Sequence, residues 1–273
     1  MHAIVLAALM AAPVRIAVLG DRTTGGDDTE AFGRCVSLAV SMRPDAVISV
    51  GDLIEGSGPA GLEIQWAEAS ALLAPLVSSV PFFATPGNHD AAGPGGGPVA
   101  TPSGPAPGIG VDTVMGVLIV SWDTSGDMDD TGAALRGLDS LLSGISPESA
   151  SVLVTHRPCW LEGQGGPGLA GGVRAAAERA DIEAVLSGHI HILRTERTGG
   201  VLYVSAGPSG GASLPSSPTG ATLPQVGWLT VDRDSASYVS LPEGAALRGG
   251  FDSPGEALLL GILRRAAAGF PAD

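Results

Sequence analysis

Polar residues of the kinds that bind metal ions stand directly after several apolar runs in this chain. Asp21 follows "IAVLG", and Asp52 follows "VISVG". Asn88 and His89 lie in "GNHD", after the apolar segment "VPFFATP", and His156 follows "SVLVT". Carboxylate, amide and imidazole groups form metal sites when the fold brings them together. The question is therefore whether these segments end at one place.

The pair "GHIH" completes the series, because His189 and His191 follow the run "EAVLSG". Four of the five histidines in the chain belong to this series. Each residue alone would be ordinary, since Asp, Asn and His are common in turns. Open α/β sheets, however, build their sites at the carboxyl ends of strands. Several strand ends that all deliver such groups therefore predict one shared metal site.

The elements that must position these residues follow from short β-branched runs, which predict buried strands. The runs are "VRIAVLG", "DAVISVG", "PFFATPG", "DTVMGVLIVSW", "SVLVT" and "IEAVLSG". Apolar spacing predicts helices over 29–42, 61–77, 132–142, 172–180 and 254–268. This alternation indicates an α/β fold with a largely parallel sheet. The later runs "VLYVSAG", "GWLTVD" and "ASYVSLP" have no helix between them and predict an antiparallel strand group.

Charge and composition narrow the classes of partner. The 273 residues are 44% hydrophobic and 15% charged, which is enough apolar material for a sizeable core. The formal net charge is −14, and all 14 basic residues are arginines. Such a surface argues against a nucleic-acid or anionic-membrane partner. A small anionic substrate remains compatible, because bound cations reverse the local field.

We expect one main domain over residues 14–250, with the C-terminal segment 251–273 packed on it as a helix. Residues 1–13 form an apolar leader, whose run Ile4–Ala12 is too short to span a bilayer. This run resembles the core of a signal peptide but lacks a basic region before it. An irregular extension into the first strand is the alternative, so both a cytoplasmic and an exported protein stay open.

Two long stretches, 91–110 and 207–224, are rich in Gly, Pro, Ala and Ser and are expected to be loops. Glycines in the second stretch either bring backbone close to the metals or form a flexible turn, which is the simpler interpretation. The two cysteines, Cys35 and Cys159, have no metal or redox spacing. We expect buried free thiols, with a disulfide as the alternative in an exported protein.

Taken in order, the polar segments resemble the motifs of the calcineurin-like metallophosphoesterase family, which includes purple acid phosphatases and protein phosphatases. The segments are "GDRT" at 20–23, "GDLIE" at 51–55, "GNHD" at 87–90, "THRP" at 155–158 and "GHIH" at 188–191. The resemblance covers residues 14–241. It implies a four-layer α/β/β/α sandwich of two mixed sheets flanked by helices, with a dinuclear metal centre.

The resemblance also implies the metal ligands. Asp52 would bridge two divalent ions, whose identity among Mn, Fe and Zn stays open. Asn88, His156 and His189 would complete one ion, and Asp21 and His191 would belong to the other. His89 would face the substrate. Asp90 is expected to orient its loop.

One position departs from the family pattern, because Thr23 stands where the family has a histidine ligand. Two roles are open to Glu55: it replaces the missing ligand, as a Tyr does in purple acid phosphatases, or it hydrogen-bonds His89, as an acid does in protein phosphatases. The second is favoured. Arg22 would hold a phosphate oxygen or pair with Glu55, and a plain surface arginine is an equal alternative. Arg157, next to His156, is open to the same two interpretations: it would hold a phosphate oxygen, or it is a plain surface arginine.

The implied function is hydrolysis of a phosphoric monoester or diester of a small molecule by a metal-bound hydroxide. His89 would protonate the leaving group, with Glu55 and Arg22 as further catalytic candidates. The alternative is a weakly active or non-catalytic relative that binds metal or a nucleotide at the same edge. Thr23 favours this alternative, whereas the presence of His89 argues against it.

Overall fold

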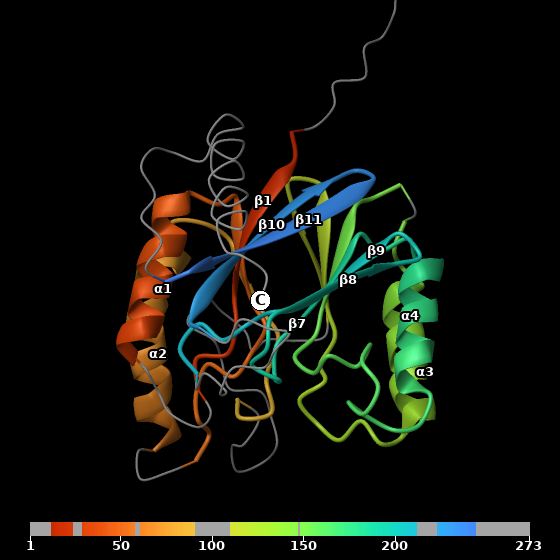
Figure 1. Ribbon diagram of the computed structural model, residues 1–273, viewed down its shortest axis with the longest axis horizontal. Helices are drawn as coiled ribbons and strands as arrows, with labels where there is room; N and C mark the ends of the chain where they lie inside the picture. The colour runs from red at the N-terminus through yellow and green to blue at the C-terminus, as the bar shows by residue number, and fades with distance from the viewer. Residues whose placement is uncertain are drawn as a thin grey trace, which may run out of the picture.

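The computed structural model describes residues 12–23, 29–57, 61–90, 110–146, 148–211 and 223–243 (Figure 1). Residues 1–11 of the expected leader and the expected helix 254–268 lie outside the described residues. So do most of the two glycine-rich and proline-rich stretches. The proposed domain bounds therefore stay predictions. No helix in the described ranges has both the length and the apolar character needed to cross a membrane.

The first sheet has five strands in the order β11-β10-β1-β2-β3. β1, β2 and β3 run parallel, whereas β10 is antiparallel to both β1 and β11. The bounds are β1 (Val14–Leu19), β2 (Ala46–Ser49), β3 (Phe82–Ala84), β10 (Gln225–Asp232) and β11 (Ser235–Pro242).

The second sheet has six strands in the order β4-β5-β6-β7-β9-β8. β5, β6, β7 and β9 are parallel, and antiparallel strands β4 and β8 form its two edges. The bounds are β4 (Gly110–Val114), β5 (Val117–Ser121), β6 (Ser151–Val154), β7 (Ala184–Ser187), β8 (Arg194–Thr198) and β9 (Val201–Ser205).

Four helices cover the outer faces of the two sheets. α1 (Thr29–Met42) and α2 (Leu62–Val77) lie on the first sheet, and α3 (Thr131–Leu142) and α4 (Leu169–Arg179) lie on the second (Figure 1). The result is the four-layer α/β/β/α sandwich of mixed sheets that the family resemblance implied.

The alternation of side chains along β1 explains how the layers adhere. Ile16 and Val18 belong to the apolar cluster between the two sheets, whereas Ala17 and Leu19 belong to the cluster under α1 and α2. Successive strand residues point to opposite faces, so a strand that is covered on both sides is apolar throughout. A third cluster joins the second sheet to α3 and α4.

Most predicted elements are present, with three corrections. The run "DTVMGVLIVSW" is a hairpin instead of one strand, because Met115 and Gly116 turn the chain at φ values of 48° and 89°. "VLYVSAG" forms β9 in the second sheet, parallel to β7, so of the three late runs only β10 and β11 pair with each other. β8, with the sequence RTERT, was missed because it has no apolar pattern.

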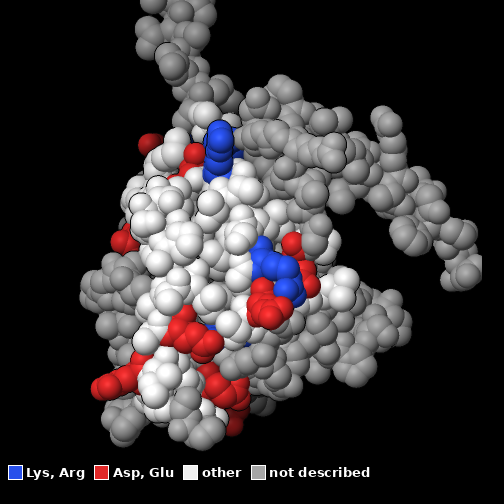
Figure 2. Space-filling model, turned by 90° about the vertical axis from the view of Figure 1, so that its left-hand side faces the viewer, with Lys and Arg blue, Asp and Glu red and all other residues white. Residues whose placement is uncertain are grey.

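Cys35 and Cys159 are buried free thiols, as expected. On the face in Figure 2, the described arginines lie beside acidic side chains and form no extended basic patch. The expectation of no nucleic-acid or anionic-membrane partner stays a prediction.

Candidate metal centre

The two sheets bring the predicted ligands to one edge, beyond the carboxyl ends of their parallel strands. Asp21 follows β1, Asp52 follows β2 and Asn88 follows β3 in the first sheet. In the second sheet, His156 follows β6, and the pair His189 and His191 follows β7. Contacts between these loops, described next, join residues up to 168 positions apart in sequence.

The shortest contacts converge on Asp52 and His156. Nε2 of His156 lies 3.3 Å from Oδ2 of Asp52 and 3.0 Å from Oδ1 of Asn88. Asp52, His156 and His189 each offer one ligand atom within 4.8 Å of the others, and they are the one such group found in the described residues. A carboxylate, two imidazoles and an adjacent amide oxygen fit a divalent transition metal ion.

The hydrogen bonds of His156 leave its inner nitrogen available for a metal. Nδ1 lies 2.8 Å from the main-chain carbonyl of Val50, and because a carbonyl only accepts, Nδ1 carries the proton. Nε2 is then the nitrogen that faces the cluster and that would give its lone pair to a metal ion on losing its proton, an arrangement typical of metal-binding histidines. Burial alone would lower the pKa of His156, but the contact with Asp52 and the charge of Asp21 raise it to about 9. The cluster thus favours positive charge at this place.

Asp21 is fully buried beside the same cluster. Its carboxylate accepts the main-chain N–H of His189 at 2.9 Å, and its Oδ1 lies 3.7 Å from Nε2 of His191. Burial raises the pKa of Asp21, and the nearby carboxylate of Asp52 adds to this. For Asp52, burial also acts to raise the pKa, but the hydrogen bond and charge of His156 outweigh it and lower the value.

Thr23 does not replace the missing histidine ligand in this structure. Its buried hydroxyl lies 2.8 Å from the carbonyl of Ile54 and 3.1 Å from that of Asp52, to which it can donate its single proton. Thr23 therefore connects the loop after β1 to the loop after β2. With the ligands that the family resemblance implies, the first metal position would keep Asp21, Asp52 and His191.

Asp90 organises the loop that carries Asp52. Its two carboxylate oxygens accept four main-chain N–H groups at 2.7 to 3.1 Å, from Asp52, Leu53, Ile54 and Gly87. Burial raises the pKa of Asp90 to about 6. This geometry agrees with the loop-orienting role expected for Asp90. Gly87 is required here, because a Cβ at this position would collide with Asp52.

His89 is held mainly by the backbone of Glu55. Nδ1 of His89 lies 2.8 Å from the main-chain carbonyl of Glu55, whereas the Glu55 carboxylate is 4.0 Å away. Nδ1 therefore carries a proton, and Nε2 is the nitrogen that remains to exchange one. At 4.0 Å the Glu55 carboxylate does not form the hydrogen bond to His89 that was expected, and the bonded partner is the peptide group. Glu55 does not belong to the compact metal-type group among the described residues.

Arg22 corrects the sequence prediction. Only 2% of its side chain is exposed, and its guanidinium donates to the carbonyl of Leu53 at 2.9 Å and pairs with Glu68 of α2 at 2.9 Å. It is neither a surface arginine nor the partner of Glu55. The carbonyl of Leu53 and the carboxylate of Glu68 engage its two terminal nitrogens, so this conformation does not present Arg22 to a phosphate.

Arg157, by contrast, lies at the metal-ligand edge. Nη1 of Arg157 is 3.1 Å from Nε2 of His189, and its main-chain N–H donates to the hydroxyl of Thr124 at 2.8 Å. Burial, followed by the charges of His156 and Arg157, lowers the pKa of His189 to about 4. The imidazole of His189 is therefore neutral, as metal binding requires.

Three residues of this edge adopt a left-handed backbone conformation that non-glycine residues rarely take. The φ values are 54° for Asp52, 71° for His189 and 53° for His191. Such conformations cost about 1–3 kcal/mol each and concentrate at functional sites. Their occurrence at three predicted ligands supports the location of the site.

Two positioning residues were missed from the sequence. Thr124, fully buried after β5, accepts the main-chain N–H groups of both His156 and Arg157 at 3.1 and 2.8 Å. Ser209 is also fully buried, and its hydroxyl accepts the N–H of Gly20. The main-chain N–H groups of residues 209–211 all donate to the carbonyl of Asp21, so this segment is no flexible turn. Its "PSGG" sequence was the available signal.

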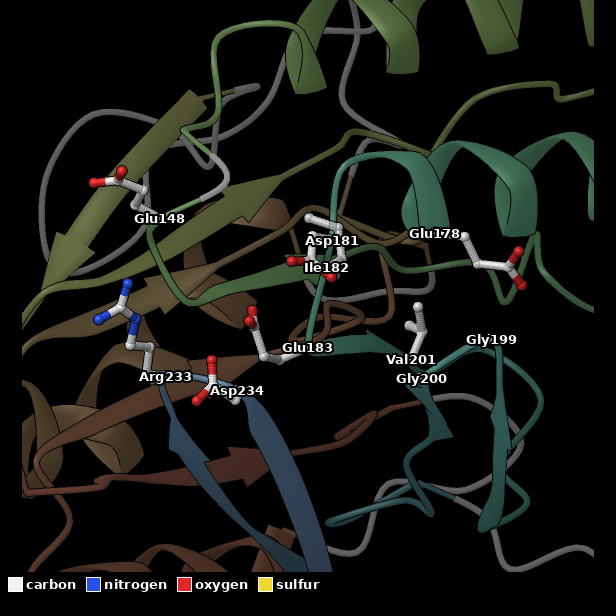
Figure 3. A pocket seen from close by; sticks show the side chains of 10 residues that line it. All are labelled: Glu148, Glu178, Asp181, Ile182, Glu183, Gly199, Gly200, Val201, Arg233 and Asp234. Carbon is white, nitrogen blue, oxygen red and sulfur yellow. The ribbon is translucent and has the colours of Figure 1, made fainter.

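A pocket of about 330 Å³ lies elsewhere, by the residues that precede β7 and by the β8–β9 and β10–β11 turns (Figure 3). The charged side chains around it are Glu148, Glu178, Asp181, Glu183, Arg233 and Asp234. Five carboxylates against one guanidinium repel a phosphate ester. None of the predicted metal ligands lines this pocket, so it is separate from the candidate centre.

Comparison with known proteins places the chain in a known sequence family. A sequence profile described as calcineurin-like phosphoesterase matches residues 14–193, which is 180 of 273 residues and includes all the predicted ligands. A search of curated proteins finds no match.

Solved structures share the fold at low identity. The purple acid phosphatase PPD1 from yellow lupin (Lupinus luteus) has a TM-score of 0.66 at 16% identity, with 89% of this chain and 53% of that one covered. GAP50, described as the anchor in the inner membrane complex of Plasmodium, has a TM-score of 0.63 at 17% identity, with 85% of each chain covered. A putative 5'-nucleotidase from Staphylococcus aureus has a TM-score of 0.53 at 15% identity, over 92% of this chain and 58% of that one. The chain thus spans about half the length of the lupin enzyme.

Proposed function

Because this chain belongs to the calcineurin-like phosphoesterase family, we propose that it hydrolyses small phosphoric esters with two divalent metal ions held between its sheets. The observation that carries the proposal is the convergence of Asp52, His156 and His189 within 4.8 Å, with the amide of Asn88 beside them. Asp52 would be shared by both ions, since a carboxylate has two oxygens. Asp21 and His191 would complete the first metal position, and Asn88, His156 and His189 would complete the other. Mn, Fe and Zn all accept this ligand set.

Bound divalent cations would activate a water molecule and neutralise charge on the phosphoryl oxygens. The residues of the chain supply the remaining steps. The main-chain N–H of His89 donates to Oδ1 of Asp52 at 2.9 Å, and Asp90 fixes the main chain of Asp52. The carboxylate of Asp52, which would hold both ions, and its main chain are therefore each fixed by a hydrogen bond. Such preorganisation avoids a reorganisation cost during the reaction.

His89 is the candidate general acid. The carbonyl of Glu55 fixes the proton on Nδ1, so a second proton on Nε2 is the one that can pass to a leaving alkoxide. About a quarter of the side chain is exposed, 24%, so a substrate can reach it. This role matters most for esters whose leaving group is a poor one.

Thr23 favours a second candidate function, a weakly active or non-catalytic relative that binds metal or a nucleotide. The hydroxyl of Thr23 is engaged with carbonyl groups, and the first metal position keeps three protein ligands. Likeness of fold does not separate the two candidates, because GAP50 is described as an anchor and the lupin protein as a phosphatase.

The proposal is tested by metal analysis together with hydrolysis of nitrophenyl phosphate and bis(nitrophenyl) phosphate. The purified chain should hydrolyse at least one ester with Mn²⁺ and lose this activity on chelation. Asp52→Asn should remove more metal and more activity than any other single ligand change. Full activity after exhaustive chelation would overturn the proposal, whereas stoichiometric metal without hydrolysis would favour the second candidate.

A further inference from the structure

We propose that Arg157 is a side-chain switch, which binds a phosphoryl oxygen of the substrate only after a metal ion has engaged His189. This inference rests on the proposed function and adds to it an order of binding, metal before phosphate. It follows from the contacts of Arg157 and from the chemistry of an imidazole ring.

The backbone of Arg157 is fixed on both sides. Its N–H donates to the hydroxyl of Thr124 at 2.8 Å, and its carbonyl accepts from the hydroxyl of Thr155 and the N–H of Cys159, each at 2.8 Å. The peptide groups on both sides of Arg157 are thus held in place. Any change at this position is therefore a movement of the side chain alone.

The guanidinium, in contrast, has one hydrogen-bond partner among the described residues. Nη1 lies 3.1 Å from Nε2 of His189. Nε of Arg157 is buried without a partner in that part of the chain, and no ion pair of Arg157 with a described carboxylate is found. A guanidinium donates and cannot accept, so Nε2 of His189 must hold the lone pair in this contact.

Metal binding by His189 is incompatible with that contact. A neutral imidazole has one lone pair and one N–H. If the metal binds Nε2, the lone pair is no longer available to Arg157. If the metal binds Nδ1, the proton resides on Nε2 and faces the N–H of Arg157, donor against donor. Either nitrogen as ligand therefore releases the guanidinium, and the positive charge of the ion repels it as well.

The released guanidinium then lies beside the metal ligands with its donors unsatisfied. Its planar fork matches two oxygens of a phosphoryl group. Without metal, the buried carboxylates of Asp21 and Asp52 repel an anion from this edge, and Arg157 is occupied by His189. The metal ion thus changes both the charge of the edge and the availability of Arg157.

The test compares Arg157→Gln with Arg179→Gln, a control that removes the same charge from α4, where Arg179 pairs with Asp139 on the surface. Calorimetric titration gives the affinity of each protein for Mn²⁺ and, after loading, for orthophosphate. In Arg157→Gln, phosphate affinity should fall about 10- to 100-fold, the size expected for a lost hydrogen bond between charged groups. Mn²⁺ affinity should rise about two- to tenfold, because a competing contact to His189 is gone. The control should change neither.

Opposite signs for the two ligands distinguish a switch from a merely structural residue, whose loss would weaken both. Weaker Mn²⁺ binding, or unchanged phosphate affinity, would overturn the inference. If Arg157→Gln does not fold, Arg157→Lys keeps the charge without the fork and should give a smaller loss of phosphate affinity. These titrations need no turnover, so a wild-type protein that binds both ligands but hydrolyses no ester would refute the proposed function and leave the switch intact.

Discussion

Oδ2 of Asp90 accepts the main-chain N–H of Asp52 at 2.7 Å, so the carboxylate of "GNHD" holds the main chain of the predicted central metal ligand. Both side chains are almost fully buried, at 3% and 1% exposure. Asp52 needs this support because its backbone is in the left-handed region. The unusual backbone conformation of Asp52 therefore depends on its hydrogen bond to Asp90.

Asp90→Asn should weaken metal binding about 10- to 100-fold, a typical loss for residues that position metal ligands. The amide nitrogen of Asn cannot accept, so at least one of the N–H groups now bound to Asp90 would lose its partner. Metal titration measures the effect. Asp232→Asn is the control, because Asp232 also accepts a main-chain N–H but in an exposed turn. Equal metal affinity in both variants would show that Asp90 does not position Asp52.

Arg22→Ala should destabilise the fold by about 2 kcal/mol or more, since the carbonyl of Leu53 would remain buried without its donor. The ion pair itself contributes less, because the side chain of Glu68 is 48% exposed. Denaturant unfolding measures the loss. Per folded molecule, the affinity of the metal-loaded protein for phosphate should remain near the wild-type value. A selective loss of phosphate affinity would show that Arg22 binds the substrate.

Glu55→Gln should keep both metal ions and reduce turnover less than tenfold, because the shorter bond of His89 is to the Glu55 peptide group, which the substitution preserves. His89→Ala should also keep both ions but should slow alkyl phosphates more than nitrophenyl phosphate, whose leaving group needs no proton. Metal content and paired rates on the two esters measure this. Loss of about one metal per chain in Glu55→Gln would instead make Glu55 a ligand.

Thr23→His should tighten the more weakly held metal ion about tenfold or more, because it returns an imidazole to a position with three protein ligands. Thr23→Val is the matched control. It removes the hydroxyl that reaches the carbonyls of Ile54 and Asp52, and should cost about 1–2 kcal/mol of folding free energy without adding a ligand. Competition with a chelator measures each ion. If Thr23→His and Thr23→Val retain metal equally, the first position does not lack a ligand.

Local patterns in the sequence predicted the alternation of strands and helices and the edge at which the polar residues meet, whereas the four layers came from the family resemblance. Asp21, Asp52 and His156 each follow an apolar run, and the ends of parallel strands meet at one edge of a sheet. The order of the motifs then identified the family. These inferences needed no knowledge of side-chain direction.

The direction of the Arg22 side chain could not be predicted, because it depends on a partner that is distant in sequence. Its partner Glu68 lies on α2, 46 positions later, and nothing local indicates that the guanidinium turns toward that helix. The sequence predicted a contact between Glu55 and His89 but not that the main-chain carbonyl of Glu55 makes it, because every residue has such a carbonyl. Ser209 was missed because its partner Gly20 is 189 positions away.

The polar strand β8 has a consequence for how copies of the protein meet. It is an outer strand of the six-stranded sheet, and an unpaired edge offers N–H and C=O groups on which another chain can add a strand. Arg194 and Arg197 stand on this edge, and Glu196 between them is bound to Arg174 of α4 at 2.7 Å. A second copy that paired here would strip these charged groups of water, which costs free energy. The lack of an apolar pattern, which hid β8 from sequence-based prediction, thus protects the sheet from growing into aggregates.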